Sequence, residues 1–130
     1  MFVIDEELTM HITRGDAVAI LVCAAIGEDE DKLDYEFRVG DVVRLNVHGK
    51  KNCANVVLQK DVAVTEPTYT VEIELTKEDT KIGDFINKPV DYWYEIELNP
   101  DTKPQTIIGY DEESGAKVFK LYPEGGVVNE

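Results

Sequence analysis

The two histidines, His11 and His48, are the first residues to weigh as catalytic groups. A histidine acts as a general base when it lies beside a nucleophile, such as the serine of a Gly-x-Ser-x-Gly turn. The sequence holds no such turn, and both histidines fall in segments that alternate as strands do. We therefore expect surface or edge histidines and assign no catalytic residue.

Paired carboxylates are the groups that hydrolyse glycosides, and four glutamates occupy alternate positions of two segments: Glu72, Glu74, Glu95 and Glu97. Such pairs are expected by chance in a chain with 27 acidic residues. A glycosidase also needs a cleft and aromatic platforms, and Trp93 is the one obvious aromatic residue on the polar side of its segment. The pattern favours a solvated face.

No group of residues has the spacing of a metal or cofactor site. The acidic segments 28–31 and 111–113 do not match an EF-hand loop, and Cys23 and Cys53 have neither CxxC spacing nor a histidine cluster. We expect no metal and no cofactor, so EDTA should leave the melting temperature unchanged. Cys23 is expected to be buried in its apolar run, and Cys53 to be exposed beside a turn.

The charge is strongly acidic and unevenly distributed. The net charge is −14 at pH 7, which disfavours binding to nucleic acid or to an anionic membrane. Residues 40–64 form a basic segment, with four cations against two acids: Arg44, Lys50, Lys51 and Lys60. This segment either docks on an acidic face of an identical copy, in a contact that salt would weaken, or is a solvated hairpin.

Trp93 is the clearest candidate for an interaction anchor, because the alternation places it on the polar side of its segment. Exposed aromatic residues often mark interfaces. The alternative is that Trp93 packs beneath a loop or a second sheet. Both interpretations stay open on sequence alone.

Residues 89–98 give the strongest structural pattern. Apolar residues and acids alternate, which is typical of a strand with one buried and one wet face. Tyr92 and Tyr94 fall on the apolar side. We expect Tyr92 to form a tyrosine corner, in which its hydroxyl bonds backbone in the preceding turn between Thr76 and Pro89.

The rest of the chain also reads as short strands between turns. Residues 8–12 are expected to form an edge strand, 17–26 a central strand, and 105–110 with 117–122 a final hairpin. Residues 56–64 are expected to form one strand with a bulge at Lys60 and Asp61, and 77–82 a short helical turn capped by Thr76. These elements predict an all-β, immunoglobulin-like β-sandwich of about seven to nine strands.

Two glycines are expected to support turns. Gly15 lies in Arg14-Gly15-Asp16, the tripeptide that integrins read, but its place between two strands gives a structural reason for a positive φ. Gly40 belongs to a turn with Asp41.

We expect one domain over residues 1–122 and a flexible tail over 123–130. The first residues are acidic and no apolar run is long enough to span a membrane, so residence in a cytoplasm is expected.

Three segments together resemble a known family: Ile12–Asp16, Phe37–Val47 and Asp91–Leu98. In this order they are similar to the immunoglobulin-like N-terminal module of phage baseplate upper proteins and of related small prophage proteins. Residues 106–110 resemble the glycine-containing hairpin of that module. The likeness covers about residues 8–122.

The resemblance implies a non-enzymatic virion component with no catalytic residues. It implies that the partners are other phage tail or baseplate proteins and that the chain can form a homo-oligomer. It also implies that the protein is made in the bacterial host cytoplasm and then becomes part of the virion. Full-length baseplate upper proteins continue into a long C-terminal part that is not present in this sequence. A carbohydrate-binding module is the alternative function for the same fold class, and a small hydrolase is the third.

Overall fold

The computed structural model describes residues 1–26, 33–50, 55–110 and 115–124. It is all-β, as predicted, and no helix occurs in these ranges. The strands of this part of the chain are β1 (Phe2–Ile4), β2 (Met10–Thr13), β3 (Val18–Val22), β4 (Ala25–Ile26), β5 (Leu33–Asp34), β6 (Val42–His48), β7 (Val56–Ala63), β8 (Val71–Leu75), β9 (Val90–Leu98), β10 (Gln105–Ile108) and β11 (Lys117–Tyr122). More strands occur than the seven to nine expected, since β1, β4 and β5 are too short to show a pattern.

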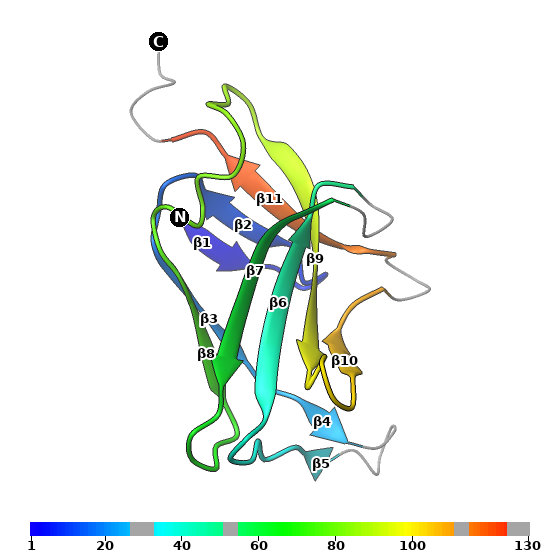
Figure 1. Ribbon diagram of the computed structural model, residues 1–130. Helices are drawn as coiled ribbons and strands as arrows, with labels where there is room; N and C mark the ends of the chain where they lie inside the picture. The colour runs from blue at the N-terminus through cyan, green and yellow to red at the C-terminus, as the bar shows by residue number, and fades with distance from the viewer. Residues whose placement is uncertain (27–32, 51–54, 111–114, 125–130) are drawn as a thin grey trace.

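The strands form one large sheet and two small ones. The large sheet has the order β1-β2-β11-β9-β6-β7, and β10 pairs with the free part of β9. The strand pairs β3–β8 and β4–β5 form the small sheets. β9 lies in the middle of the large sheet, with β6 on one edge and β11 and β10 on the other; Figure 1 shows β9 between β6 and β10.

A single apolar core joins the large sheet to the β3–β8 pair. The inward residues alternate along the strands, as in β8, where Val71, Ile73 and Leu75 are buried and the two glutamates between them are exposed. Phe37 and Phe119 are the largest fully buried side chains. This two-layer arrangement fits the predicted sandwich.

The predicted tyrosine corner at Tyr92 is wrong. The Tyr92 hydroxyl makes no hydrogen bond within the described residues and lies over Gly83, against the space that a Cβ there would occupy. Tyr94 makes the buried bond: its hydroxyl donates to the Leu8 carbonyl at 2.6 Å. Burial, with a smaller effect of the Asp5 charge, raises the pKa of Tyr94. Tyr94 therefore ties the N-terminal segment to β9.

We expect Tyr94→Phe to lower the free energy of unfolding by about 1 kcal/mol, because it removes a partly buried hydrogen bond to the Leu8 carbonyl. Tyr92→Phe removes a hydroxyl of the same strand that has no described partner, and should cost much less. Urea denaturation of both variants measures the difference. Equal losses would contradict the assignment of the bond to Tyr94.

The edge and central strands were also misassigned. β2 is not an edge strand, because β1 pairs with it on its outer side. Residues 17–26 do not form a central strand: among the described residues β3 pairs with β8 alone, and Leu21 on its outer side is 64% exposed. Cys23 is exposed rather than buried, since the apolar run faces solvent on one side. Cys53 and the acidic segments 28–31 and 111–113 lie outside the described residues.

The final hairpin does not form, because β10 and β11 do not pair with each other. β10 lies along the end of β9 near Leu98, and β11 lies along its beginning, with Phe119 opposite Tyr92. β9 is long enough to accept both strands on one edge. β11 then pairs in parallel with β2 on its other side.

The helical turn at residues 77–82 is not present. Thr76 does form the expected cap, in which its hydroxyl accepts from the Asp79 amide and its own amide donates to Asp79. The turn ends at once, because the Thr80 hydroxyl donates to the Asp16 carbonyl and Gly83 takes a φ of 70°.

The bulge predicted in residues 56–64 is misplaced. The register of β7 shifts opposite Val47 and His48, not at Lys60 and Asp61.

Candidate functional site on the outer face of the large sheet

The alternation of three neighbouring strands places a polar row on the side of the large sheet away from the core. We call this row the outer face. Its members are Arg44, Asn46 and His48 of β6, Gln59 and Asp61 of β7, and Trp93, Glu95 and Glu97 of β9. It contains two of the predicted interaction residues, Trp93 and Arg44.

Trp93 lies at the end of this row and is half-buried. It stands opposite His48 of β6 and Val118 of β11. The sequence correctly placed Trp93 on the polar side of β9, but its neighbours cover part of the ring. The remaining surface can serve as an apolar anchor within a polar surround.

Arg44 is held between two carboxylates. Its guanidinium donates to both Asp61 oxygens, at 2.7 and 2.9 Å, and to both Asp101 oxygens, at 3.3 and 3.0 Å. Bonding to Asp61 and then Asp101 raises the pKa of Arg44, and the Arg44 bond lowers the pKa of Asp61. This geometry neutralises one of the four cations that the basic-segment interpretation counted.

The other predicted cations do not join Arg44 in one patch. Lys60 points to the core side of β7, where its ammonium lies 2.9 Å from Asp79. Burial opposes ionisation of Asp79, but the Thr76 amide and Lys60 outweigh it and lower the pKa of that carboxyl. Lys50 is exposed, and Lys51 lies outside the described residues. The basic segment is therefore split between two sides of the sheet.

An amide row runs across the middle of the outer face. Gln59 donates to the Asn46 side-chain carbonyl at 2.8 Å, and Asn46 donates to Glu97 at 3.1 Å. Asn46 is nearly fully buried beneath its neighbours. These bonds fix the amides, because each one satisfies the next.

His48 is also buried. Its Nε2 lies 3.3 Å from the Glu95 carboxylate, whereas its Nδ1 has no hydrogen-bond partner among the residues that the structure describes. A neutral ring that bonds a carboxylate carries its proton on Nε2. No serine, threonine or cysteine of the described ranges bonds either histidine.

The four glutamates considered for glycoside chemistry lie on two different sheets. Glu95 and Glu97 accept bonds on β9, as described above, and Glu72 and Glu74 are exposed on β8. The bond and the charge of Glu74 raise the pKa of Glu72. The structure does not bring all four carboxylates to one cleft.

A second polar cluster was missed by sequence reasoning. The ring nitrogens of His11 lie 2.9 Å from Asp5 and 2.7 Å from the Tyr122 hydroxyl. Asp5 also accepts from the amides of Glu7 and Thr9. The bond from His11, followed by that from Thr9, lowers the pKa of Asp5. The cluster fastens the N-terminal turn to β11, which no local pattern indicates.

The cluster predicts a pH dependence. A carboxyl whose pKa is lowered by folding stabilises the fold above its unfolded pKa, and loses that effect as pH falls through the folded pKa. The stability difference between the wild type and Asp5→Asn should therefore shrink below about pH 4. Urea melts of both proteins measure it. Glu6→Gln, which removes the exposed acid next to Asp5 in the sequence, is the control, and a difference independent of pH would contradict the prediction.

Two segments that carry the family resemblance are used as internal clamps. Arg14 donates to the Gly83 carbonyl at 2.8 Å, to the Ile82 carbonyl at 3.5 Å and to Glu124 at 2.6 Å. Gly15, with a φ of 89°, donates its amide to Thr80. The Arg-Gly-Asp tripeptide is thus engaged by the fold, and Glu124, which the sequence placed in the tail, takes part.

Asp41 forms the second clamp. It accepts from the Tyr35 hydroxyl at 2.7 Å, from the Arg38 amide at 3.0 Å and from the Asn99 side chain at 3.1 Å. Gly40 precedes it with a φ of 97°, which a glycine adopts without strain. The clamp closes the turn before β6 onto the end of β9.

No group of three or more metal-ligating side chains occurs among the residues described. The same part of the chain has no helix long and apolar enough to cross a membrane. Comparisons with protein-family models, curated proteins and solved structures found no match.

Proposed function

We propose that this chain is a non-enzymatic structural protein of a bacteriophage or prophage particle. In this proposal it acts as a tail or baseplate assembly module, through contacts with other tail or baseplate proteins or with copies of itself. It is made in the bacterial host cytoplasm and then joins the virion. The resemblance of three segments to baseplate upper proteins is the starting point.

The observation that supports the proposal best is the role of the resembling residues. Arg14 and Asp41 each hold three partners within the fold. Their side chains are used to specify a sandwich rather than to meet a substrate. This use of the resembling residues agrees with a protein that acts by presenting a folded surface to other proteins and does not catalyse a reaction.

Trp93 is the proposed anchor of the contact surface. It combines a partly exposed indole with a face on which the amides are already bonded, since Asn46 bonds Glu97 and Gln59. Docking a partner against these amides avoids the cost of leaving them unpaired. The anchor would carry most of the binding energy, as central aromatic residues do.

The test is recovery of the protein in particles. The host strain is induced, particles are purified by density gradient, and the chain is quantified by mass spectrometry. We expect co-purification with tail proteins and its loss in Trp93→Ala, with Tyr110→Ala, another exposed aromatic, as the control. A wild-type protein that stays wholly in the unassembled fraction would contradict the proposal.

Carbohydrate binding is the second candidate, since Trp93 shares its face with the amides of Asn46 and Gln59. An aromatic ring beside amides is the combination that sugars need. The amides already bond Glu97 and each other, which weakens this alternative. Affinity electrophoresis on bacterial surface polysaccharides would favour it if retardation depended on Trp93.

A further inference from the structure

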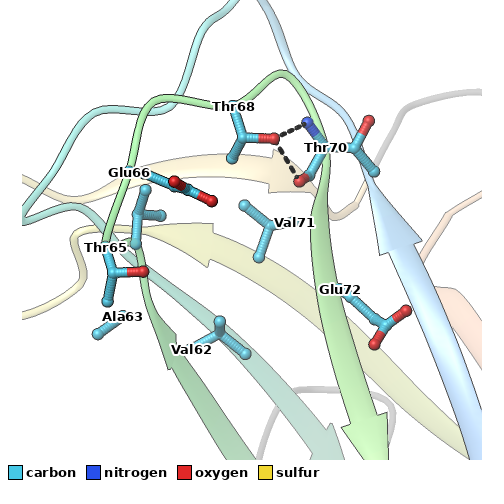
Figure 2. Close-up of a pocket in the computed structure, with 9 residues that line it drawn as sticks. Val62, Ala63, Thr65, Glu66, Thr68, Thr70, Val71 and Glu72 are labelled. Atoms are coloured by element: carbon cyan, nitrogen blue, oxygen red, sulfur yellow. Dashed lines mark hydrogen bonds between the residues drawn. The ribbon is translucent and has the colours of Figure 1, made fainter.

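A groove lies between the end of β7 and the start of β8 (Figure 2), and β7 is at the end of the large sheet's strand order away from β1. Its volume is about 240 Å³. The end of β7, the connecting loop and the start of β8 line it, among them Val62, Thr65, Glu66, Val71 and Glu72.

Within the described part of the chain, both strands that border the groove have a free edge there. β7 is the last strand of the large sheet, and β8 pairs with β3, no residue of which lines the groove. In an antiparallel pair, alternate residues turn their N–H and C=O groups away from the partner strand. The eight residues of β7 therefore offer a row of groups that another extended chain can pair with.

The lining combines an apolar floor with one acid at the mouth. Figure 2 shows the side chains of Val62 and Val71 facing the hollow and the Glu66 carboxylate directed across it. No bond of Glu66 is found within the described residues. The Thr68 hydroxyl is occupied, because it accepts from the Thr70 amide and donates to the Thr70 carbonyl. The loop is thus fixed while Glu66 stays available.

The size and lining suit a segment of polypeptide better than a small molecule. Pockets for small molecules usually measure about 300–1,000 Å³, more than this groove holds. No aromatic residue lines the groove, so it lacks the stacking surface of a sugar site. One or two side chains of an extended peptide would fill it.

We propose that this groove receives an extended, basic segment of a partner protein, which adds as a strand to the free edge of β7. An apolar side chain of the segment would cover Val62 and Val71, and a lysine or arginine would meet Glu66. This inference rests on the assembly role proposed above. Strand addition supplies affinity through the backbone, and pockets for alternate side chains supply specificity.

Charge decides the kind of partner. Both charged side chains of the lining, Glu66 and Glu72, are acidic, and the whole chain carries −14. A positive segment is attracted to such a groove. A second copy of this chain would bring its own excess of negative charge to the contact and is disfavoured.

A short blocked peptide of alternating lysine and valine is the probe, and the same peptide with glutamate for lysine is its matched control. In an NMR titration of the ¹⁵N-labelled protein, the lysine peptide should shift amides of residues 62–66 and 70–72. Its affinity should fall as salt is raised from about 0.05 to 0.5 M. Glu66→Lys should weaken binding about tenfold or more, Glu66→Gln less, and Glu6→Lys not at all.

Several results would overturn the inference. Equal weakening by Glu66→Lys and Glu6→Lys would mean attraction to overall charge, and shifts confined to other strands would mean a different site. A peptide-independent dimer that protects the β7 amides from exchange would assign the edge to a second copy. If peptide binding is absent while Trp93→Ala still abolishes incorporation into particles, the groove is wrong and the assembly role stands. If the peptide binds at the groove but the protein is never found in particles, the groove inference stands and the assembly role is wrong.

Discussion

Replacing Arg14 by alanine is expected to lower the free energy of unfolding by about 2–4 kcal/mol, the largest effect of any surface-proximal substitution considered. The Arg14 side chain is only 12% exposed, and its guanidinium bonds two backbone carbonyls and Glu124. Its removal leaves the carbonyls of Ile82 and Gly83 without donors and frees the end of the chain after β11. Chemical denaturation followed by Trp93 fluorescence measures the loss.

Arg14→Lys is the informative control. A lysine keeps the charge opposite Glu124 but lacks the planar fork that reaches two carbonyls at once. It should therefore recover only part of the stability. Glu124→Gln should cost less than Arg14→Ala, because both carbonyls keep their donor. A value for Arg14→Ala near zero would mean that the Arg-Gly-Asp tripeptide is not a structural clamp and is free for recognition.

Asp41→Ala is expected to cost about 2–3 kcal/mol, since three donors lose one charged acceptor. Burial opposes ionisation of Asp41, but its bonds from Arg38, Tyr35 and Asn99 outweigh it, so its pKa is lowered. A lowered pKa means that the carboxylate stabilises the fold above the unfolded value and stops doing so as pH falls through the folded one. The cost of Asp41→Ala should thus decrease below about pH 4.

Tyr35→Phe separates the contributions to this clamp. It removes one of the three bonds to Asp41 and keeps the ring, which packs edge-on to Phe37 at a centroid distance of 5.2 Å. Its cost should be about 1 kcal/mol and should vanish when combined with Asp41→Ala. Full additivity of the two substitutions would show that they do not share an interaction.

Strands with one solvent-exposed face were predictable from the sequence, because apolar and polar residues alternate with a period of two along such a strand. β8 and β9 are the examples: their buried residues are those that alternation selects. The all-β class follows from such segments alone. The partner of each strand does not, since pairing depends on residues far apart in the chain. β10 and β11 follow one another, yet both pair with β9.

The candidate site was predictable to the same extent. Alternation placed Trp93 on the outer side of β9, but only the register of β6 against β7 and β9 brings Arg44 to Asp61 and Asn46 to Glu97. Counting charges along residues 40–64 therefore overstated a basic patch. Tyr92 and Tyr94 differ by one step of the same pattern, and only the distant Leu8 carbonyl decides which hydroxyl is bonded.

The position of β11 in the large sheet also constrains how the chain is made. β11 separates β2 from β9, and Met10 pairs with Phe119, so nearly the whole chain lies between the two partners. Contacts this distant in sequence form slowly. Until residues 117–122 leave the ribosome, β1–β2 has no sheet to join, and the edges of β2 and β9 stay open to other nascent chains. Free strand edges can pair with other chains, so the edges of β2 and β9 are most exposed to wrong pairing in the interval before β11 is synthesised.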